Sequence, residues 1–175
     1  MRERSLVIPK KLRKPQLKAQ EAGGPDKMRS IRRRCGDVFR VPLGGKYFAY
    51  GRVLEDPLFE FYSRFETKEA TPSDMRILPV AFRIWVAPFA ITTGRWPIIG
   101  HVSLRERPVP PQKFFIKDPI TGKLSIYSLP KPIPATPAQC RDLEAAAGWD
   151  PEHVEDRLRD LQAGRPNVWY ESMKA

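Results

Sequence analysis

The chain has 175 residues, a hydrophobic content of 41% and two cysteines. This length and composition fit one globular domain with an additional tail, and they exclude a small scaffold held together by disulfides. No apolar run reaches the roughly 18 to 20 residues of a membrane span, and the N-terminus lacks the apolar core of a secretion signal. We therefore expect a cytoplasmic protein with two free thiols, Cys35 and Cys140, and no membrane partner.

The net charge of +11 is concentrated at the N-terminus. Residues 1–34 contain twelve Lys or Arg and three Asp or Glu, which leaves residues 35–175 nearly neutral. Because this segment has few large apolar side chains, it cannot bury enough surface to offset the entropy of ordering. We expect a basic disordered arm over residues 1–34 and a single β-rich domain over residues 35–170. The arm could contact nucleic acid through its phosphates or act only as a solubilising tail, and translation could start at Met28 instead of Met1.

Residues 36–54 predict a β-hairpin. Phe39 and Val41 fall on one face of the first strand, and Ala49 and Val53 fall on one face of the second, which is the period-two alternation of half-buried strands. The two glycines between the strands can adopt the positive φ angles of a two-residue turn. A hairpin alone is unstable in water, so the rest of the chain must pack against it.

Further strands are predicted after the hairpin. Residues 58–65 predict a third strand, and residues 80–86 predict the strongest one, because β-branched and aromatic residues alternate along it between two prolines. Residues 114–116 and 124–127 predict a second hairpin.

Two helices are predicted to end the chain, after a proline-rich crossing over residues 129–137. Thr136-Pro137 and Asp150-Pro151 each combine an N-cap residue with a proline at the first helical position, and Gly148 and Gly164 are typical helix ends. We therefore expect an α+β, β-rich fold: a strongly bent antiparallel sheet or small barrel of five to seven strands, with two C-terminal helices packed on it.

The sequence contains no recognisable catalytic or cofactor motif. His101 and His153 lie on different predicted elements and have no metal-ligand spacing, and there is neither a glycine-rich phosphate loop nor a nucleophile elbow. We expect no enzyme, no cofactor and no metal.

Four residues are candidates for contact with a partner: Arg83, Trp85, Arg95 and Trp96. Arg and Trp are the residue types most enriched at binding hot spots, and Arg95-Trp96 lies on a predicted loop. The alternative is that both tryptophans are core residues, with the arginines held against an acidic side chain such as Asp37 or Glu55. The sequence leaves both interpretations open.

Several motifs, taken in order, resemble the immunity protein 26 family of bacterial polymorphic toxin systems. They are Gly36-Asp37-Val38-Phe39 through Tyr50-Gly51-Arg52-Val53-Leu54, Phe82-Arg83-Ile84-Trp85-Val86, residues 91–100, residues 114–124 and the helical residues 152–158. The resemblance implies a protein that neutralises a cognate toxin without catalysis. Motifs shared across a family that faces many toxins should be mostly scaffold, so contacts that select a toxin are expected on residues 58–76 and 101–113.

Two other classes of function remain open on the sequence. A small β-barrel regulator could bind nucleic acid with the basic arm, although the domain lacks the interleaved basic and aromatic stripes of a single-strand-binding platform. A purely structural, self-associating module is the third possibility.

Overall fold

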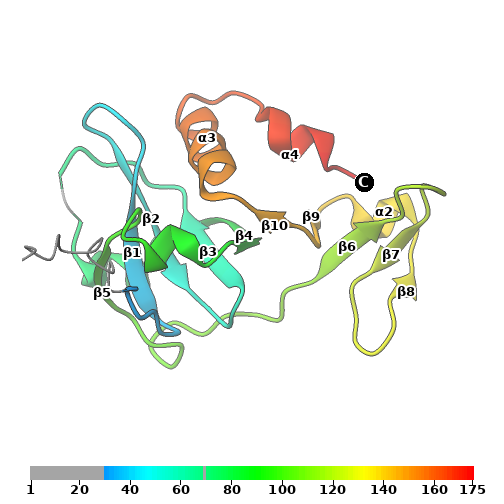
Figure 1. The fold of residues 1–175 in the computed structure, drawn as a ribbon, viewed down its shortest axis with the longest axis horizontal. Helices are drawn as coiled ribbons and strands as arrows, with labels where there is room; N and C mark the ends of the chain where they lie inside the picture. The colour runs from blue at the N-terminus through cyan, green and yellow to red at the C-terminus, as the bar shows by residue number, and fades with distance from the viewer. Residues whose placement is uncertain (1–29, 69) are drawn as a thin grey trace, which may run out of the picture.

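The described part of the chain forms two β-sheets and a C-terminal helical region (Figure 1). The structure is a computed structural model that describes residues 30–68 and 70–175. The basic arm predicted over residues 1–34 therefore lies almost wholly outside the described residues.

The larger sheet contains the predicted hairpin and the predicted third and fourth strands. Its strands are β1 (Asp37–Pro42), β2 (Phe48–Val53), β3 (Leu58–Tyr62), β4 (Val80–Val86), β5 (Ile98–His101) and β10 (Gly148–Trp149). Their order is β10-β4-β3-β2-β1-β5, and every pairing is antiparallel except that of β10 with β4. This meander follows the chain order from β1 to β4, as expected when neighbouring strands are joined by short turns.

The hairpin register agrees with the alternation in the sequence. Phe39 lies opposite Gly51 and Val41 lies opposite Ala49, so the apolar side chains of both strands share one face of the sheet. Gly44 and Gly45 have φ angles of 91° and 57°. The turn is one residue longer than predicted, because the Leu43 amide donates to the Tyr47 carbonyl.

One face of the larger sheet forms the main core. Phe39 stacks on Trp96 at a centroid distance of 5.4 Å, and Phe61 meets Trp96 edge-on at 5.7 Å. Two helices cover this face: α1 (Phe89–Thr92) and α3 (Pro151–Gln162), whose Val154 and Leu158 are fully buried in the same cluster. The alternation of β4 places Phe82, Ile84 and Val86 here and turns Arg83 and Trp85 to the opposite face. That face packs against the 3₁₀ helix η1 (Pro72–Arg76).

The smaller sheet stands beside the larger one (Figure 1). Its order is β8-β7-β6-β9, formed by β6 (Phe114–Lys117), β7 (Leu124–Ile126), β8 (Ile133–Pro134) and β9 (Glu144–Ala145). The strands β6 and β7 are the second predicted hairpin, and α2 (Pro137–Cys140) connects β8 with the segment leading to β9. We call residues 113–147 the lobe.

The α+β, β-rich fold class is confirmed, but its details differ from the prediction. The strands of the described residues form two open sheets in place of one bent sheet or barrel. The helix predicted from Pro137 ends after one turn, because Ala145 pairs with β6 and Trp149 pairs with β4. These non-local pairings override the helix propensity of the intervening alanines. The helix α3 lies where it is predicted, and a short helix, α4 (Val168–Ser172), follows it.

Candidate partner-binding surface

Arg83 belongs to a charge cluster on the sheet face opposite the main core. Its Nε donates to Glu60 Oε2 at 2.9 Å, and Arg52 Nη2 lies 2.9 Å from Glu60 Oε1, with both Arg52 and Glu60 fully buried. Arg107, from the loop after β5, lies 3.7 Å from the same carboxylate. Arg52, Glu60 and Arg83 sit opposite one another on β2, β3 and β4, so the strand register itself creates the cluster.

The cluster is hydrogen-bonded beyond its ion pairs. Arg52 donates to the carbonyls of Val102 and Arg107, and Tyr62 donates to Glu60 at 3.0 Å. Burial, and next the nearby Glu60 carboxylate, raise the pKa of Tyr62 well above its usual range. A buried carboxylate is tolerated only when cations and donors surround it in this way. The arrangement fixes the loop after β5 to the sheet.

Trp85 lies at the junction of the two sheets. Its ring contacts Phe114 of β6 at a centroid distance of 4.8 Å and Tyr127, just after β7, at 5.0 Å. Trp85 therefore contacts the lobe and holds it against β4.

Arg95 and Trp96 lie on the other side of the larger sheet, against α3. Arg95 forms a bidentate ion pair with Glu155, with Nε–Oε1 and Nη2–Oε2 distances of 2.7 and 3.0 Å. Trp96 is fully buried and its indole nitrogen donates to the same Glu155 at 2.9 Å. Arg159 of α3 also reaches Glu155, at 3.4 Å, and donates to the carbonyl of Leu43.

The pKa values of Glu155 and Arg95 follow from these contacts. Burial disfavours the ionised Glu155, but the hydrogen bonds from Arg95 and Trp96 and the charges of Arg95 and Arg159 outweigh it and lower the Glu155 pKa. The bond to Glu155 in turn raises the pKa of Arg95. Glu155 therefore stays ionised and anchors α3 to the loop before β5.

The four candidate residues thus form two separate pairs on opposite faces of one sheet. Trp96 is a core residue, while Arg95 keeps 36% of its side-chain surface exposed. The predicted acidic neighbours Asp37 and Glu55 were the wrong ones: Glu60 holds Arg83, and Glu155 with Glu152 holds Arg95. Sequence separation hides the second pairing, because Glu155 lies 60 residues after Arg95. A role of these residues in partner contact stays a prediction.

A polar cleft of about 570 Å³ lies at the edge formed by β1 and β5. Asp37 accepts from the Arg34 amide at 2.7 Å and lies 3.1 Å from His101 Nδ1, and Arg32 and Arg34 line the cleft. No nucleophile completes an acid–base group with Asp37 and His101 in these contacts. Across the described residues, no cluster of three or more His, Cys, Asp or Glu could hold a metal ion.

An apolar pocket of about 410 Å³ is lined by the loop predicted to select a partner. Its walls come from residues 108–112 and Leu104 on that loop, and from Leu54 and Leu58 on the larger sheet. The other expected segment, residues 58–76, is only partly available, because Leu58–Tyr62 is an inner strand.

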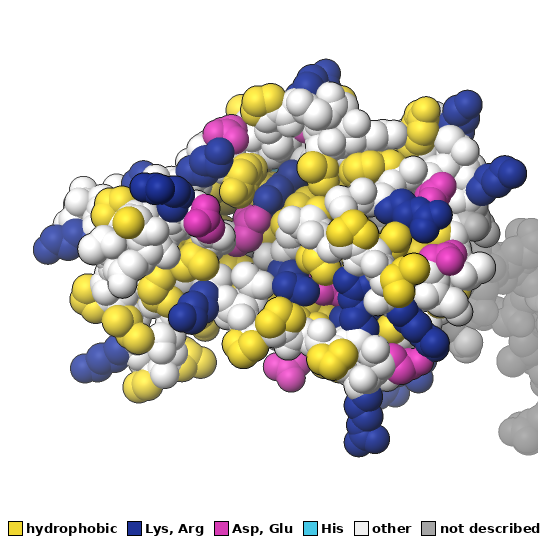
Figure 2. Space-filling model, turned by 180° about the vertical axis from the view of Figure 1, so that it is seen from behind, with side chains coloured by type: hydrophobic (Ala, Val, Ile, Leu, Met, Phe, Trp, Pro, Cys, Tyr) yellow, Lys and Arg dark blue, Asp and Glu magenta, His cyan; other side chains and the backbone are white. Residues whose placement is uncertain are grey.

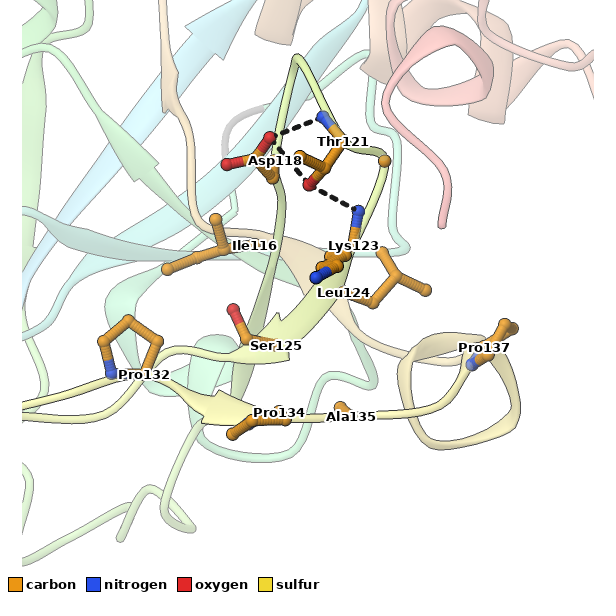
Figure 3. Close-up of a pocket in the computed structure, with 11 residues that line it drawn as sticks. Ile116, Asp118, Thr121, Lys123, Leu124, Ser125, Pro132, Pro134, Ala135 and Pro137 are labelled. Carbon is orange, nitrogen blue, oxygen red and sulfur yellow. Dashed lines mark hydrogen bonds between the residues drawn. The ribbon is translucent and has the colours of Figure 1, made fainter.

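A larger open pocket of about 670 Å³ lies on the lobe (Figure 3). Ile116, Ser125 and Pro134 form a row across β6, β7 and β8 along its floor, as the strand register requires. The β6–β7 turn closes one end, where Asp118 accepts from Thr121 (Figure 3). Hydrophobic and basic side chains lie next to one another over the lobe, at the left of Figure 2.

The comparisons with known proteins identify the family. The family model Immunity protein 26 matches residues 34–125, which run from the start of β1 to the middle of β7. No curated protein and no solved structure matches the chain. Among the described helices, none is both long enough and apolar enough to cross a bilayer. Because the match covers more than half of the chain, the protein belongs to the Immunity protein 26 family.

Proposed function

We propose that this protein binds one cognate bacterial toxin of a polymorphic toxin system and blocks it stoichiometrically, without catalysis. The match of residues 34–125 to the Immunity protein 26 family carries the proposal. The structure is compatible with it, since large apolar side chains such as Ile120 and Leu129 are exposed on a lobe that also exposes lysines, which suits protein binding.

The proposed mechanism is occlusion. The inhibitor covers the active site of the toxin or a surface beside it, through an interface of about 1,600 Å² in total. The buried charge clusters around Glu60 and Glu155 hold the loop after β5 and helix α3 on the larger sheet. A rigid inhibitor loses less conformational entropy on binding, which favours a tight complex.

Growth rescue tests the proposal. The protein encoded beside this one is expressed in a sensitive bacterial host, alone and together with the full chain. We expect growth to stop when the neighbour is expressed alone and to recover on co-expression. A harmless neighbour, or one that kills despite co-expression, would contradict the proposal.

A stoichiometry measurement distinguishes binding from enzymatic inactivation. Titration of a catalytically inactive toxin variant into the purified protein should give a saturable complex at a fixed molar ratio. If substoichiometric amounts of this protein inactivated the active toxin, that result would contradict the non-catalytic mechanism.

A further inference from the structure

We propose that the lobe, residues 113–147, is the surface that receives the toxin, and that it takes an acidic toxin face with an apolar centre. This inference rests on the proposed function and names the partner surface within it.

The lobe exposes large apolar side chains to solvent. Ile120 is 92% exposed, Leu129 is 79% exposed and Ile133 is 56% exposed, and Tyr127 is also exposed. Ile120 lies in the turn between Asp118 and Thr121, which line the open pocket. Ile133 pairs with Ile126 and therefore lies on the other face of the small sheet. Exposed large apolar side chains beside a hollow are typical of protein interaction sites.

The turn that carries Ile120 is ordered by its own hydrogen bonds. The Asp118 carboxylate accepts from the amides of Ile120 and Thr121 at 3.0 and 2.7 Å and from the Thr121 hydroxyl at 2.9 Å. These bonds lower the pKa of Asp118 and so favour its ionised, bonded form. Ile120 is therefore presented in a fixed position, as a preorganised anchor requires.

The lobe is also held firmly on the rest of the protein. Trp85 packs against Phe114 and Tyr127, and Arg157 of α3 forms a bidentate ion pair with Glu144 of β9 at 3.0 and 2.6 Å. The exposed apolar side chains consequently belong to a rigid part of the molecule.

The charges on the lobe differ from those on the larger sheet. Arg52 and Arg83 of the larger sheet are paired with Glu60, and Arg159 of α3 and Arg95 before β5 are paired with Glu155. By contrast, four exposed lysines of the lobe form no ion pair with any described residue: Lys113, Lys117, Lys123 and Lys131. Free cations around an apolar patch favour an acidic partner and steer its approach.

The same charges argue against a second copy of this chain as the occupant. The lobe contains five Lys or Arg and three Asp or Glu, and two of those acids are already bonded, Asp118 in its turn and Glu144 to Arg157. A symmetric contact would bring like charges together, which is unfavourable.

The test uses the full chain and the inactive variant of the neighbouring toxin, with affinities measured by calorimetry. Ile120→Asp should weaken the complex about tenfold or more, because it places a carboxylate at an apolar anchor facing an acidic surface. The matched control is Ile77→Asp, since Ile77 is 84% exposed and lies outside the lobe; its affinity should stay within about twofold of wild type. Unchanged thermal unfolding of both variants shows that they fold.

A charge-reversal pair supplies an independent measurement. Lys123→Glu with Lys131→Glu should slow association about tenfold at low salt, and the difference should shrink as salt rises. The control reverses Lys46 and Lys68, exposed lysines of the larger sheet region, with the same change in net charge.

The outcomes separate this inference from the proposed function. If the wild-type chain neither binds the toxin nor rescues growth, both the proposed function and the lobe assignment are overturned. A wild-type complex that both lobe variants leave unchanged overturns the lobe assignment alone. Sedimentation showing a dimer that Ile120→Asp dissociates, with toxin affinity unchanged, would identify a second copy as the occupant and also overturn the assignment.

Discussion

Glu60 is the residue on which the charged face of the larger sheet depends. It is fully buried, and it contacts Arg52, Arg83 and Arg107 and accepts from Tyr62. Removing one partner of a buried ion pair is costly because the remaining charge stays desolvated.

We therefore predict that Glu60→Gln lowers the free energy of unfolding by about 3 kcal/mol or more, since Arg52 loses the buried carboxylate with which it is paired. Urea unfolding at neutral pH measures this loss. Glu171→Gln is the control, because Glu171 pairs with Lys174 at the surface and its loss should cost less than about 1 kcal/mol. Equal effects of the two variants would contradict the assigned role of the cluster.

Gly51 has a steric function in the main core. A Cβ atom at this position would lie 2.4 Å from Phe39 Cζ and 2.7 Å from the Glu60 carbonyl oxygen. We predict that Gly51→Ala destabilises the protein by about 1 to 3 kcal/mol through overpacking. Gly148→Ala is the matched control in a strand, since no atom lies within 4 Å of its Cβ position. A neutral Gly51→Ala in thermal unfolding would show that the Phe39 ring can move aside.

At the scale of elements, α3 is attached to the sheet by both apolar and charged contacts. Its buried side is formed by Val154 and Leu158, and Glu155 connects it to Arg95 and Trp96. The helix begins at Pro151 after Asp150, and the chain leaves it at Gly164, whose φ is 64°. Position and orientation of α3 thus depend on a carboxylate that must be ionised.

The lowered pKa of Glu155 predicts a pH-dependent contribution to stability. Because the folded-state pKa lies below the unfolded value of about 4.3, the contribution is complete above that value and is lost as the pH falls through the folded-state pKa. Glu155→Gln should thus cost about 1 to 2 kcal/mol at pH 7. Relative to wild type, this deficit should shrink as the pH falls below about 4. Urea unfolding of both proteins across this range checks it, and a deficit that stays constant to pH 3 would contradict the ionic role.

The junction at Trp85 predicts how the lobe responds to mutation. Trp85→Leu removes the ring contacts with Phe114 and Tyr127 but leaves the main core, which lies on the opposite face, intact. Amide hydrogen exchange should therefore accelerate in β6 and β7 by about tenfold or more and change little in β1 to β3. Uniform acceleration over both sheets would show that the lobe and the larger sheet unfold as one unit.

At the scale of the whole molecule, the Lys and Arg side chains fall into groups with different surroundings. Arg52 and Arg83 of the larger sheet and Arg159 of α3 are paired with buried carboxylates, while four lysines of the lobe form no ion pair with any described residue. Nine of the 31 Lys and Arg lie in residues 1–29, outside the described residues.

This division predicts separable binding activities. Deleting residues 1–29 should reduce affinity for duplex DNA by about tenfold or more at 50 mM salt and flatten its salt dependence, because phosphate contacts release counterions. Toxin affinity should stay unchanged. Filter binding over a salt series measures the affinity for DNA, and calorimetry measures the affinity for the toxin. Undiminished DNA binding by the shortened chain would instead place nucleic-acid contact on the domain.

The candidate residues show how far sequence reasoning reaches. Arg83 and Trp85 alternate with Phe82, Ile84 and Val86 along β4, so the side on which they lie follows from the strand itself, because side-chain direction in a strand is a local property. Their partners Glu60 and Phe114 could not be predicted, since register and sheet packing decide which strands meet. The same holds for Arg95, whose partner Glu155 is on a distant helix.

By itself the sequence determined the local elements: the strands of the first hairpin, the strand β4, the second hairpin and α3 with its Asp150-Pro151 start. Each depends on backbone preferences and periodicity within a few residues. Only the tertiary structure decided that Glu144–Ala145 and Gly148–Trp149 pair as strands, that the described strands divide into two sheets, and that the lobe exposes Ile120 among exposed lysines. These features arise from contacts between residues far apart in the chain, whose energies local preferences do not contain.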